Sequence, residues 1–186
     1  KLKPGDEFSR EKLTESTKLI VDRLGNDGYA FANVNPVPEI DRDKATVAFT
    51  LYVDPGRRVY IRRINITGNA TTRDEVIRRE LRQLEGGWYS AQKLQRSKQR
   101  VDKLGYFSEV TLDTVGVPGV PDQVDINLKV VERPTGNLLF GVGYSSAEGV
   151  IFSGAVSQNN LFGTGNALSL QVNTGNVNTV YALSFT

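Results

Sequence analysis

Few residues of this sequence could perform covalent chemistry. It contains neither histidine nor cysteine, so it cannot form a nucleophile–histidine pair, a reactive thiol, or a metal site built on those ligands. The sequence also lacks a Gly-x-Ser-x-Gly nucleophile motif. We therefore expect a protein that is not an enzyme and that carries no cofactor and no catalytic metal.

Three other groups of residues were considered as binding sites. Asp41 and Asp43 flank a turn without the spacing of an EF-hand loop, so we expect them to be solvated. Gly141-x-Gly143 and Gly163-x-Gly165 lack the third glycine and the helix of a dinucleotide loop. Four arginines between residues 57 and 63 form a basic cluster without a groove-reading motif, so no nucleic-acid partner is expected. We expect these arginines to lie at a solvated strand end, and contact with anionic lipid headgroups is the alternative.

Residues 137–186 differ from the rest of the chain in both charge and periodicity. The chain has 23 Lys and Arg and 21 Asp and Glu, but this stretch contains only Glu148 of these. Large apolar residues alternate there with Gly, Ser, Ala, Asn or Gln at Leu138, Phe140, Val142 and Tyr144, at Val150, Phe152 and Val156, at Leu168, Leu170 and Val172, and at Tyr181, Leu183 and Phe185.

This alternation has a period of two, which predicts strands with two different faces. Large apolar residues on one face and small or uncharged polar residues on the other are typical of transmembrane β-barrel strands. The alternative is a soluble antiparallel sheet with one buried face, although its solvated face would normally carry charge. No run of 18 apolar residues occurs, so no transmembrane helix is expected.

Residues 1–134 contain an internal repeat. The run F-S-R-E-K-L at residues 8–13 resembles Y-S-A-Q-K-L at residues 89–94, and V-D-R-L-G at residues 21–25 matches V-D-K-L-G at residues 101–105. Alternating apolar residues of two strands also correspond: Val47, Phe49, Leu51 and Val53 with Val124, Ile126, Leu128 and Val130. The repeat predicts helix–strand–strand for residues 1–55 and β-α-α-β-β for residues 56–134.

Start and stop signals locate the helices of the two repeats. Ser9 is a candidate N-cap for the first helix, and Gly25 is a candidate C′ glycine at its end. Thr72 to Glu75 has capping-box spacing and predicts a helix up to Glu85. A further helix is expected from Ser90 to Gly105, followed by strands over residues 107–115 and 124–131. Val59 and Ile61 are out of phase with Ile64 and Ile66, which indicates a bulge near Arg62.

Several motifs of the second repeat, D-K-L-G-Y-F at 102–107, V-P-G-V-P-D-Q-V-D at 117–125 and V-E-R-P-T-G-N at 131–137, resemble the last POTRA domain of the BamA family of outer-membrane assembly factors. G-V-G-Y at 141–144 and N-L-F-G-T-G-N at 160–166 resemble the start of that family's barrel. The resemblance covers essentially the whole chain. It implies an α+β fold in which tandem POTRA (β-α-α-β-β) domains precede antiparallel strands that begin a transmembrane β-barrel.

The resemblance also implies a domain division and a function. Residues 1–55 would be a partial POTRA domain, 56–134 a complete one, and 135–186 the first four strands of a sixteen-stranded barrel. The protein would bind unfolded β-barrel proteins and insert them into the bacterial outer membrane, with its POTRA domains in the periplasm. Its partners would be lipoprotein subunits and outer-membrane lipid. Since Lys1 is not preceded by Met or a signal peptide, an internal or processed start is expected.

Two other functions remain open. One is a two-partner-secretion type polypeptide transporter of the same superfamily, and the other is a porin or adhesin barrel with periplasmic anchor domains. Candidate partner-binding residues are Arg78 and Glu85, which lie in the motif R-R-E-L-R-Q-L-E-G that the resemblance associates with a lipoprotein partner. The alternative, which the charge pattern itself favours, is a salt-bridged solvent face.

The resemblance also implies two strands as candidate sites for pairing with client polypeptides. The first is the edge strand from Phe107 to Val115, with Phe107, Glu109, Thr111 and Asp113, whose far end Pro118 and Pro121 would blunt. The second is the first barrel strand, whose seam residues are Leu138, Phe140, Gly141, Val142, Gly143 and Tyr144. Its two glycines predict an edge that pairs weakly and can open, or alternatively they make room inside the barrel.

Overall fold

The computed structural model describes residues 5–146 and 149–186; residues 1–4, 147 and 148, among them Lys1 and Glu148, lie outside these ranges. The helices are α1 (Arg10–Asn26), α2 (Asp74–Arg78) and α3 (Ala91–Lys103), and η1 (Leu161–Gly163) is a short 3-10 turn. Among the described residues, no helix is both long and apolar enough to cross a membrane.

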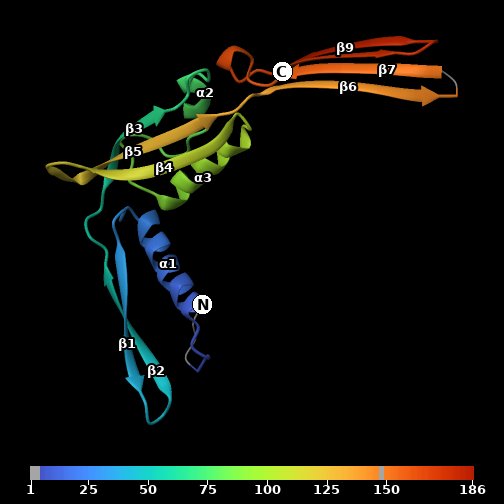
Figure 1. Ribbon diagram of the computed structural model, residues 1–186. Helices are drawn as coiled ribbons and strands as arrows, with labels where there is room; N and C mark the ends of the chain where they lie inside the picture. Colours follow the sequence, from blue (N-terminus) through green and yellow to red (C-terminus); the bar gives the residue numbers. More distant parts are fainter. Residues whose placement is uncertain (1–4, 147–148) are drawn as a thin grey trace. The chain divides into compact units, whose positions relative to one another are not determined.

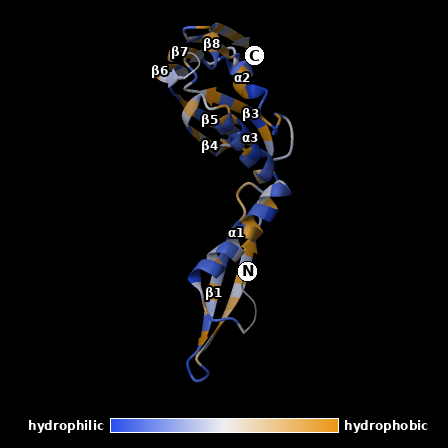
Figure 2. Cartoon of the chain, turned by 90° about the vertical axis from the view of Figure 1, so that its right-hand side faces the viewer, coloured by the Kyte–Doolittle hydropathy of each residue, from blue (hydrophilic) through white to orange (hydrophobic). Residues whose placement is uncertain are grey.

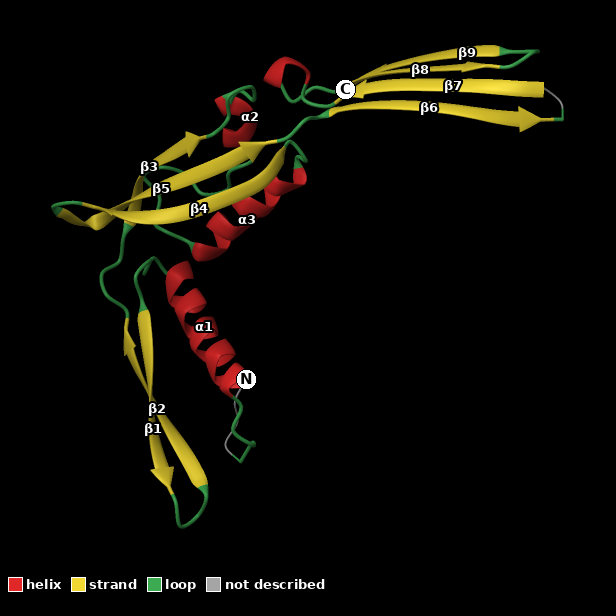
Figure 3. Ribbon diagram, in the orientation of Figure 1, coloured by secondary structure: helices red, strands yellow, loops and turns green. Residues whose placement is uncertain are grey.

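The strands form three sheets that can be followed in Figures 1 and 3. A two-stranded sheet contains β1 and β2, a three-stranded sheet has the order β3-β5-β4, and a four-stranded sheet has the order β6-β7-β8-β9. Their bounds are β1 (Asn33–Asp41), β2 (Thr46–Asp54), β3 (Tyr60–Thr67), β4 (Phe107–Val117), β5 (Val120–Glu132), β6 (Gly136–Ser145), β7 (Gly149–Gln158), β8 (Leu168–Thr174) and β9 (Thr179–Phe185).

Contacts divide the chain into two compact units. One comprises Lys1–Asn65, Leu81–Lys98 and Leu112–Leu128, and the other comprises Ile66–Glu80, Gln99–Thr111 and Lys129–Thr186. In the first unit, β1 and β2 form an antiparallel hairpin whose register runs from Asn33 opposite Asp54 to Asp41 opposite Thr46. The tip of this hairpin is hydrophilic (Figure 2).

The start of α1 agrees with its sequence signal, but its end does not. Ser9 is the N-cap, and its hydroxyl accepts a hydrogen bond from the Lys12 N–H at 3.4 Å. The helix continues through Gly25 to Asn26, and the left-handed glycine is Gly28 (φ 105°). Gly25 is instead buried in a close contact, because a Cβ there would lie 3.0 Å from the Cβ of Ala91.

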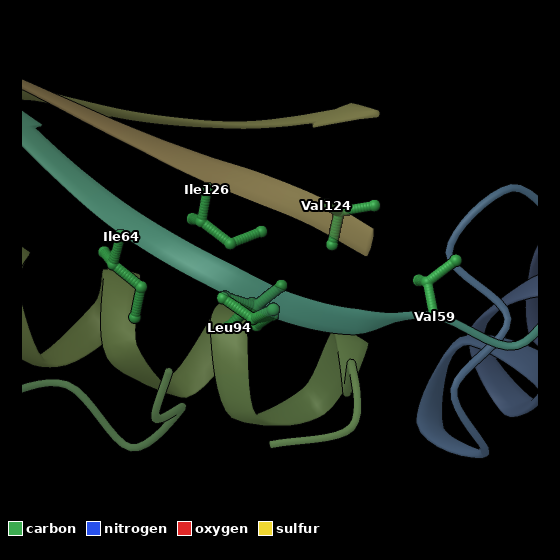
Figure 4. Close-up of a cluster of buried hydrophobic side chains, with 6 residues drawn as sticks. Val59, Ile64, Leu94, Val124 and Ile126 are labelled. Atoms are coloured by element: carbon green, nitrogen blue, oxygen red, sulfur yellow. The ribbon is translucent and has the colours of Figure 1, made fainter. Parts of the chain in front are cut away.

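The core of the first unit joins α3 to one face of strands β3 and β5. Its buried residues are Val59, Ile61, Ile64, Leu94, Val124 and Ile126, and Figure 4 shows Leu94 on its helix facing side chains from the strands. Arg62 and Arg63 are both exposed between the buried Ile61 and Ile64. The alternation of buried and exposed side chains along β3 is therefore interrupted there, as the sequence indicates. On the other face, the guanidinium of Arg62 forms an ion pair with Asp125.

The helix predicted from Thr72 to Glu85 is wrong in both its start and its length. The helix α2 covers only Asp74–Arg78, and its N-cap is Arg73. The backbone beyond it has other partners: the N–H of Arg82 donates to the Ser97 hydroxyl at 2.8 Å. The N–H groups of Gly86 and Tyr89 donate to the carbonyls of Ile61 and Val59. These long-range bonds take the place of a continued helix, and Leu84 is 71% exposed.

Strands β4 and β5 are longer than the sequence predicts. They extend to Val117 and back from Val120, so only Pro118 and Gly119 separate them. Gly119 has φ 78°, a conformation that glycine adopts without steric penalty. Pro121 lies inside β5. The prediction that Pro121 helps to end the preceding strand is therefore wrong.

The four-stranded sheet has the two faces that alternation predicts. Its register places Val142 opposite Phe152, Phe152 opposite Thr174, and Val172 opposite Tyr181. One face therefore collects the large apolar residues Leu138, Phe140, Val142, Tyr144, Val150, Phe152, Val156, Leu168, Leu170, Val172, Tyr181, Leu183 and Phe185. The opposite face carries mainly small or uncharged polar residues, together with three large apolar ones: Gly141, Ser153, Ala155, Ser169, Gln171, Asn173, Ala182 and Ser184, and Leu139, Ile151 and Val180. The expected fold class, α+β with antiparallel strands after the two repeats, is confirmed.

Candidate functional site

The first strand of the four-stranded sheet, β6, lies at one edge of that sheet. It pairs with β7 along its whole length, from Gly136 opposite Gln158 to Ser145 opposite Gly149. Its large side chains are strongly exposed, with Leu138 and Phe140 both at 77% and Tyr144 at 80%. An edge strand with an apolar face and main-chain groups along its outer side can pair with another extended chain.

The two glycines of β6 have different surroundings. At Gly141, a Cβ would lie 2.7 Å from the Ser153 hydroxyl oxygen, and that hydroxyl donates to the Gly141 carbonyl at 3.3 Å. At Gly143, a Cβ would meet nothing within 4 Å. Gly141 therefore makes room for a neighbouring polar side chain, whereas the space above Gly143 is open.

Hydrogen bonds to β7 hold the residues that lead into β6. The Asn159 N–H donates to the Thr135 carbonyl at 3.1 Å, and the Gln158 amide donates to the Thr135 hydroxyl at 2.9 Å. A Cβ at Gly136 would lie 2.7 Å from the Gln158 amide oxygen. These hydrogen bonds fasten the backbone around Pro134 and Gly136 on the β7 side.

The turn between β7 and β8, residues 159–167, is fixed by a buried asparagine. Asn160 is 5% exposed and has φ 63°, a left-handed conformation that asparagine tolerates better than most residues. Its side-chain amide donates to the Thr72 hydroxyl at 2.8 Å, and its side-chain carbonyl accepts from the Gly165 N–H at 2.9 Å. Thr72 is 3% exposed.

A carboxylate on the other side of Thr72 completes this network. The Glu132 carboxylate accepts hydrogen bonds from the Thr72 N–H at 2.6 Å and from the Thr71 N–H at 2.9 Å. Burial by itself raises the pKa of Glu132, but hydrogen bonds from Thr72 and Thr71 outweigh burial and bring the pKa below the ordinary glutamate value. Glu132 is therefore held ionised. We call Asn160, Thr72 and Glu132 the Asn160 network.

Backbone contacts add to the Asn160 network. The Arg73 N–H donates to the Gly163 carbonyl at 3.0 Å, and the Tyr106 hydroxyl donates to the Gly165 carbonyl at 3.1 Å. Gly163 has φ 71°, and a Cβ there would lie 1.9 Å from the Thr71 carbonyl oxygen. Only glycine fits at this position, because the two backbones approach too closely for any side chain.

A cavity of about 540 Å³ lies beside this turn. It is lined by Thr71, Thr72, Tyr106, Glu132, Arg133, Pro134, Thr135, Gln158, Asn160, Leu161 and Phe162. Phe162, at the tip of the turn, is 83% exposed and has φ 51°. The turn is therefore attached through polar contacts, while its largest apolar side chain remains in solvent.

The other candidate strand, β4, is also at an edge, since the order of its sheet is β3-β5-β4. Of the four candidate residues, Phe107 is buried in the core at 6% exposure, whereas Glu109 and Asp113 are exposed. Thr111 is half-buried and its hydroxyl donates to the Glu109 carboxylate at 3.1 Å. Only main-chain groups and the exposed side chains are therefore available to an added strand.

Arg78 and Glu85 do not share a helix. Arg78 is the last residue of α2, and its guanidinium donates to the Asp74 carboxylate at 2.8 Å in an i,i+4 pair. Glu85 follows the helix, and its carboxylate accepts from the Ile64 N–H at 2.8 Å. Glu85 therefore binds the backbone of β3 as well as presenting an exposed charge.

Sequence reasoning missed the Asn160 network. The run N-N-L-F-G-T-G-N does contain the Asn and Gly residues that left-handed turns favour. Its partner Thr72, however, is 88 residues away in sequence. Within the described residues, no group of three or more acidic side chains could hold a metal ion.

Known proteins share both the sequence and the architecture. The POTRA family, described as "Surface antigen variable number repeat", matches residues 1–56 and 59–133. The outer membrane protein assembly factor BamA of Neisseria meningitidis serogroup B is 44% identical over 185 residues, which is 100% of this chain and 23% of that protein. The chain thus spans less than a quarter of that relative's length.

Solved structures agree with the sequence match. The crystal structure of BamA from Haemophilus ducreyi lacking POTRA domains 1–3 aligns with a TM-score of 0.87 and 36% identity, covering 98% of this chain and 34% of that one. The Haemophilus influenzae BamA POTRA3–5 structure aligns with a TM-score of 0.68 and 38% identity, covering 70% of this chain and 52% of that one. The chain belongs to the POTRA family, as a homologue of the BamA outer membrane protein assembly factors.

Proposed function

We propose that this chain belongs to an outer-membrane assembly factor that binds unfolded β-barrel proteins and folds and inserts them into the outer membrane. In this proposal residues 1–55 are a partial POTRA domain, residues 56–134 are a complete one, and residues 135–186 are the first strands of the barrel wall. The POTRA domains lie in the periplasm, and the apolar face of β6 to β9 contacts outer-membrane lipid.

The observation that carries this proposal is the edge strand β6. The strand keeps an apolar face with Leu138 and Phe140 each 77% exposed, while its main chain lies at the edge of the sheet. A client strand can add to such an edge through backbone hydrogen bonds, which tolerate many sequences. The free energy for insertion comes from the client's own strand pairing and apolar burial.

A reversible crosslink at the β6 edge tests this proposal. In the full-length protein, a cysteine at Gly143 is paired with one on the facing residue of the strand that closes the barrel. Gly143 suits this purpose better than Gly141, because a Cβ at Gly143 meets nothing within 4 Å. Oxidation should stop insertion of clients into lipid vesicles, and reductant should restore it.

The single-cysteine variants under the same oxidant are the matched controls. Full insertion with the crosslink formed would contradict client entry at β6. Release of the client on the far side of the vesicle membrane, without insertion, would instead indicate a polypeptide transporter.

The second edge, β4, is proposed to bind clients before insertion. Glu109 and Asp113 are exposed on this strand, and its outer main chain is available for strand addition. Such pairing would hold an extended client and leave its side chains free to vary.

Arg78 and Glu85 are proposed to dock a lipoprotein subunit. Glu85→Lys would remove both the exposed charge and the acceptor for the Ile64 N–H, so it cannot separate docking from folding. Glu85→Gln keeps an acceptor oxygen and removes the charge. It should weaken partner pull-down and flatten the salt dependence of binding while leaving thermal unfolding unchanged. Unchanged pull-down with Glu85→Gln would assign Glu85 to the β3 backbone alone.

A further inference from the structure

The β7–β8 turn is attached by an unusual balance of interactions. Its apolar tip contributes little, since Phe162 is 83% exposed and the adjacent cavity measures about 540 Å³. Its polar groups, by contrast, are buried and paired: Asn160 at 5% and Thr72 at 3% exposure share a hydrogen bond of 2.8 Å. Hydrogen bonds rather than apolar packing therefore fasten this turn.

The turn is connected directly to the edge strand. β7 ends at Gln158, one residue before the turn, and pairs with β6 over the full length of both strands. Because the two strands are paired along their whole length, a displacement of the turn would be passed through β7 to β6. The residues that hold the turn, Thr71 to Arg73 and Glu132, come from the segments before α2 and at the end of β5.

We propose that Asn160 and Thr72 are positioning residues for client insertion, which fasten the β7–β8 turn and so hold the edge strand β6 in its working place. This inference rests on the proposed function, because β6 must be the strand that clients join. Neither residue touches the client. Each acts through the turn, so that releasing the turn leaves client binding intact and slows insertion.

The chain offers variants that separate the side chain from the backbone. Asn160→Gly removes the amide but keeps a residue that adopts φ 63° without strain. Asn159→Gly makes the same change at the neighbouring exposed asparagine and is the matched control. Thr72→Val keeps the shape of the buried side chain but removes the hydroxyl, whereas Thr72→Ser restores the hydroxyl.

The first measurement follows attachment of the turn in the full-length protein in lipid. The Arg73 N–H donates to the Gly163 carbonyl and makes no bond to Asn160, so its hydrogen exchange reports release of the whole turn. Thr72→Val loses one hydrogen bond and Asn160→Gly loses two, so each should speed this exchange by about tenfold or more, since one net hydrogen bond contributes about 1 kcal/mol. Asn159→Gly and Thr72→Ser should match the wild type.

The second measurement compares client binding with insertion. For Asn160→Gly and Thr72→Val, the dissociation constant of an unfolded client should stay unchanged, and the insertion rate into vesicles should fall about tenfold in parallel with exchange. Faster exchange with a normal insertion rate would overturn the proposal while leaving the proposed function standing. Unchanged exchange in Asn160→Gly would overturn it as well. A wild-type protein that inserts no client would instead refute the proposed function.

Discussion

The three-stranded and four-stranded sheets carry the same period-two pattern but bury it in different ways. In the sheet β3-β5-β4, Ile61 and Leu128 are 0% exposed and Ile126 is 1% exposed. In the sheet β6-β7-β8-β9, Phe140 remains 77% and Leu183 73% exposed. The first sheet is covered by a helix of its own chain, whereas the second presents its apolar face outward.

The opposite faces explain the difference. The outer face of the three-stranded sheet carries charged and amide pairs, such as Arg62 with Asp125 and Asn65 with Asn127, which water solvates readily. The second face of the four-stranded sheet carries mostly Gly, Ser, Ala, Asn and Gln, with Leu139, Ile151 and Val180 among them, and no described charge. The three-stranded sheet is covered within its own chain, whereas the apolar face of the four-stranded sheet needs a cover from outside the described residues, which lipid would supply in the proposed function.

The largest expected effect is on the free energy of unfolding, which truncation of an apolar side chain should lower in the three-stranded sheet but not in the four-stranded one. Leu128→Ala should lower the free energy of unfolding by about 2–5 kcal/mol, because it removes buried methyl groups and leaves a cavity. Leu138→Ala, at 77% exposure, should change it by less than about 0.5 kcal/mol. Chemical unfolding of this chain without detergent, followed through its single tryptophan, measures both. Equal losses would mean that the two apolar faces are buried alike.

A charge on either face of β6 sharpens the same comparison. Val142→Arg places a guanidinium on the apolar face and should disfavour folding in lipid by about 2–4 kcal/mol if the residue lies near the membrane midplane. Gly143→Arg, one residue along, projects from the opposite face into open space and should be tolerated. The folded fraction of the full-length protein in vesicles, assayed by heat-modifiable gel mobility, distinguishes them. Equal tolerance would argue against lipid on the apolar face.

Both sheets also leave an edge strand, and proline tests the edge that lies in the three-stranded sheet. Successive N–H groups of a strand point to opposite sides, so one of Thr111→Pro and Leu112→Pro removes an outward donor and the other an inward one. The outward variant should lose client crosslinking by about tenfold at unchanged stability, whereas the inward variant should lower thermal stability. Normal crosslinking in both would exclude strand addition at β4.

The smallest effect concerns acid. Hydrogen bonds from Thr72 and Thr71 lower the pKa of Glu132 despite its burial, so its stabilising contribution is present above the unfolded-state pKa of about 4.3 and is lost as the pH falls through the lower folded value. Amide resonances of Thr71 and Thr72 should shift between pH 6 and pH 3. Glu132→Gln, which does not titrate, should show no such shift. A shift that persists in Glu132→Gln would assign it to another group.

The sequence by itself determined the strands of residues 137–186 and their two faces. The alternation of Leu138, Phe140 and Val142 with small residues is local, and the extended backbone turns it into faces without help from distant residues. The N-cap at Ser9 and the change of phase at Arg62 were likewise predictable, since both depend on neighbours within a few positions.

Only the tertiary structure decided the role of Thr72 and the length of α2. Local spacing favours Thr72 as a helix cap, but its hydroxyl is bonded to Asn160 and its N–H to Glu132. The Arg82 N–H, expected inside a helix, donates to the hydroxyl of Ser97. In each case a partner far away in sequence satisfies a buried polar group. Because an unpaired buried donor or acceptor is unfavourable by about 1–3 kcal/mol, such contacts override local propensity.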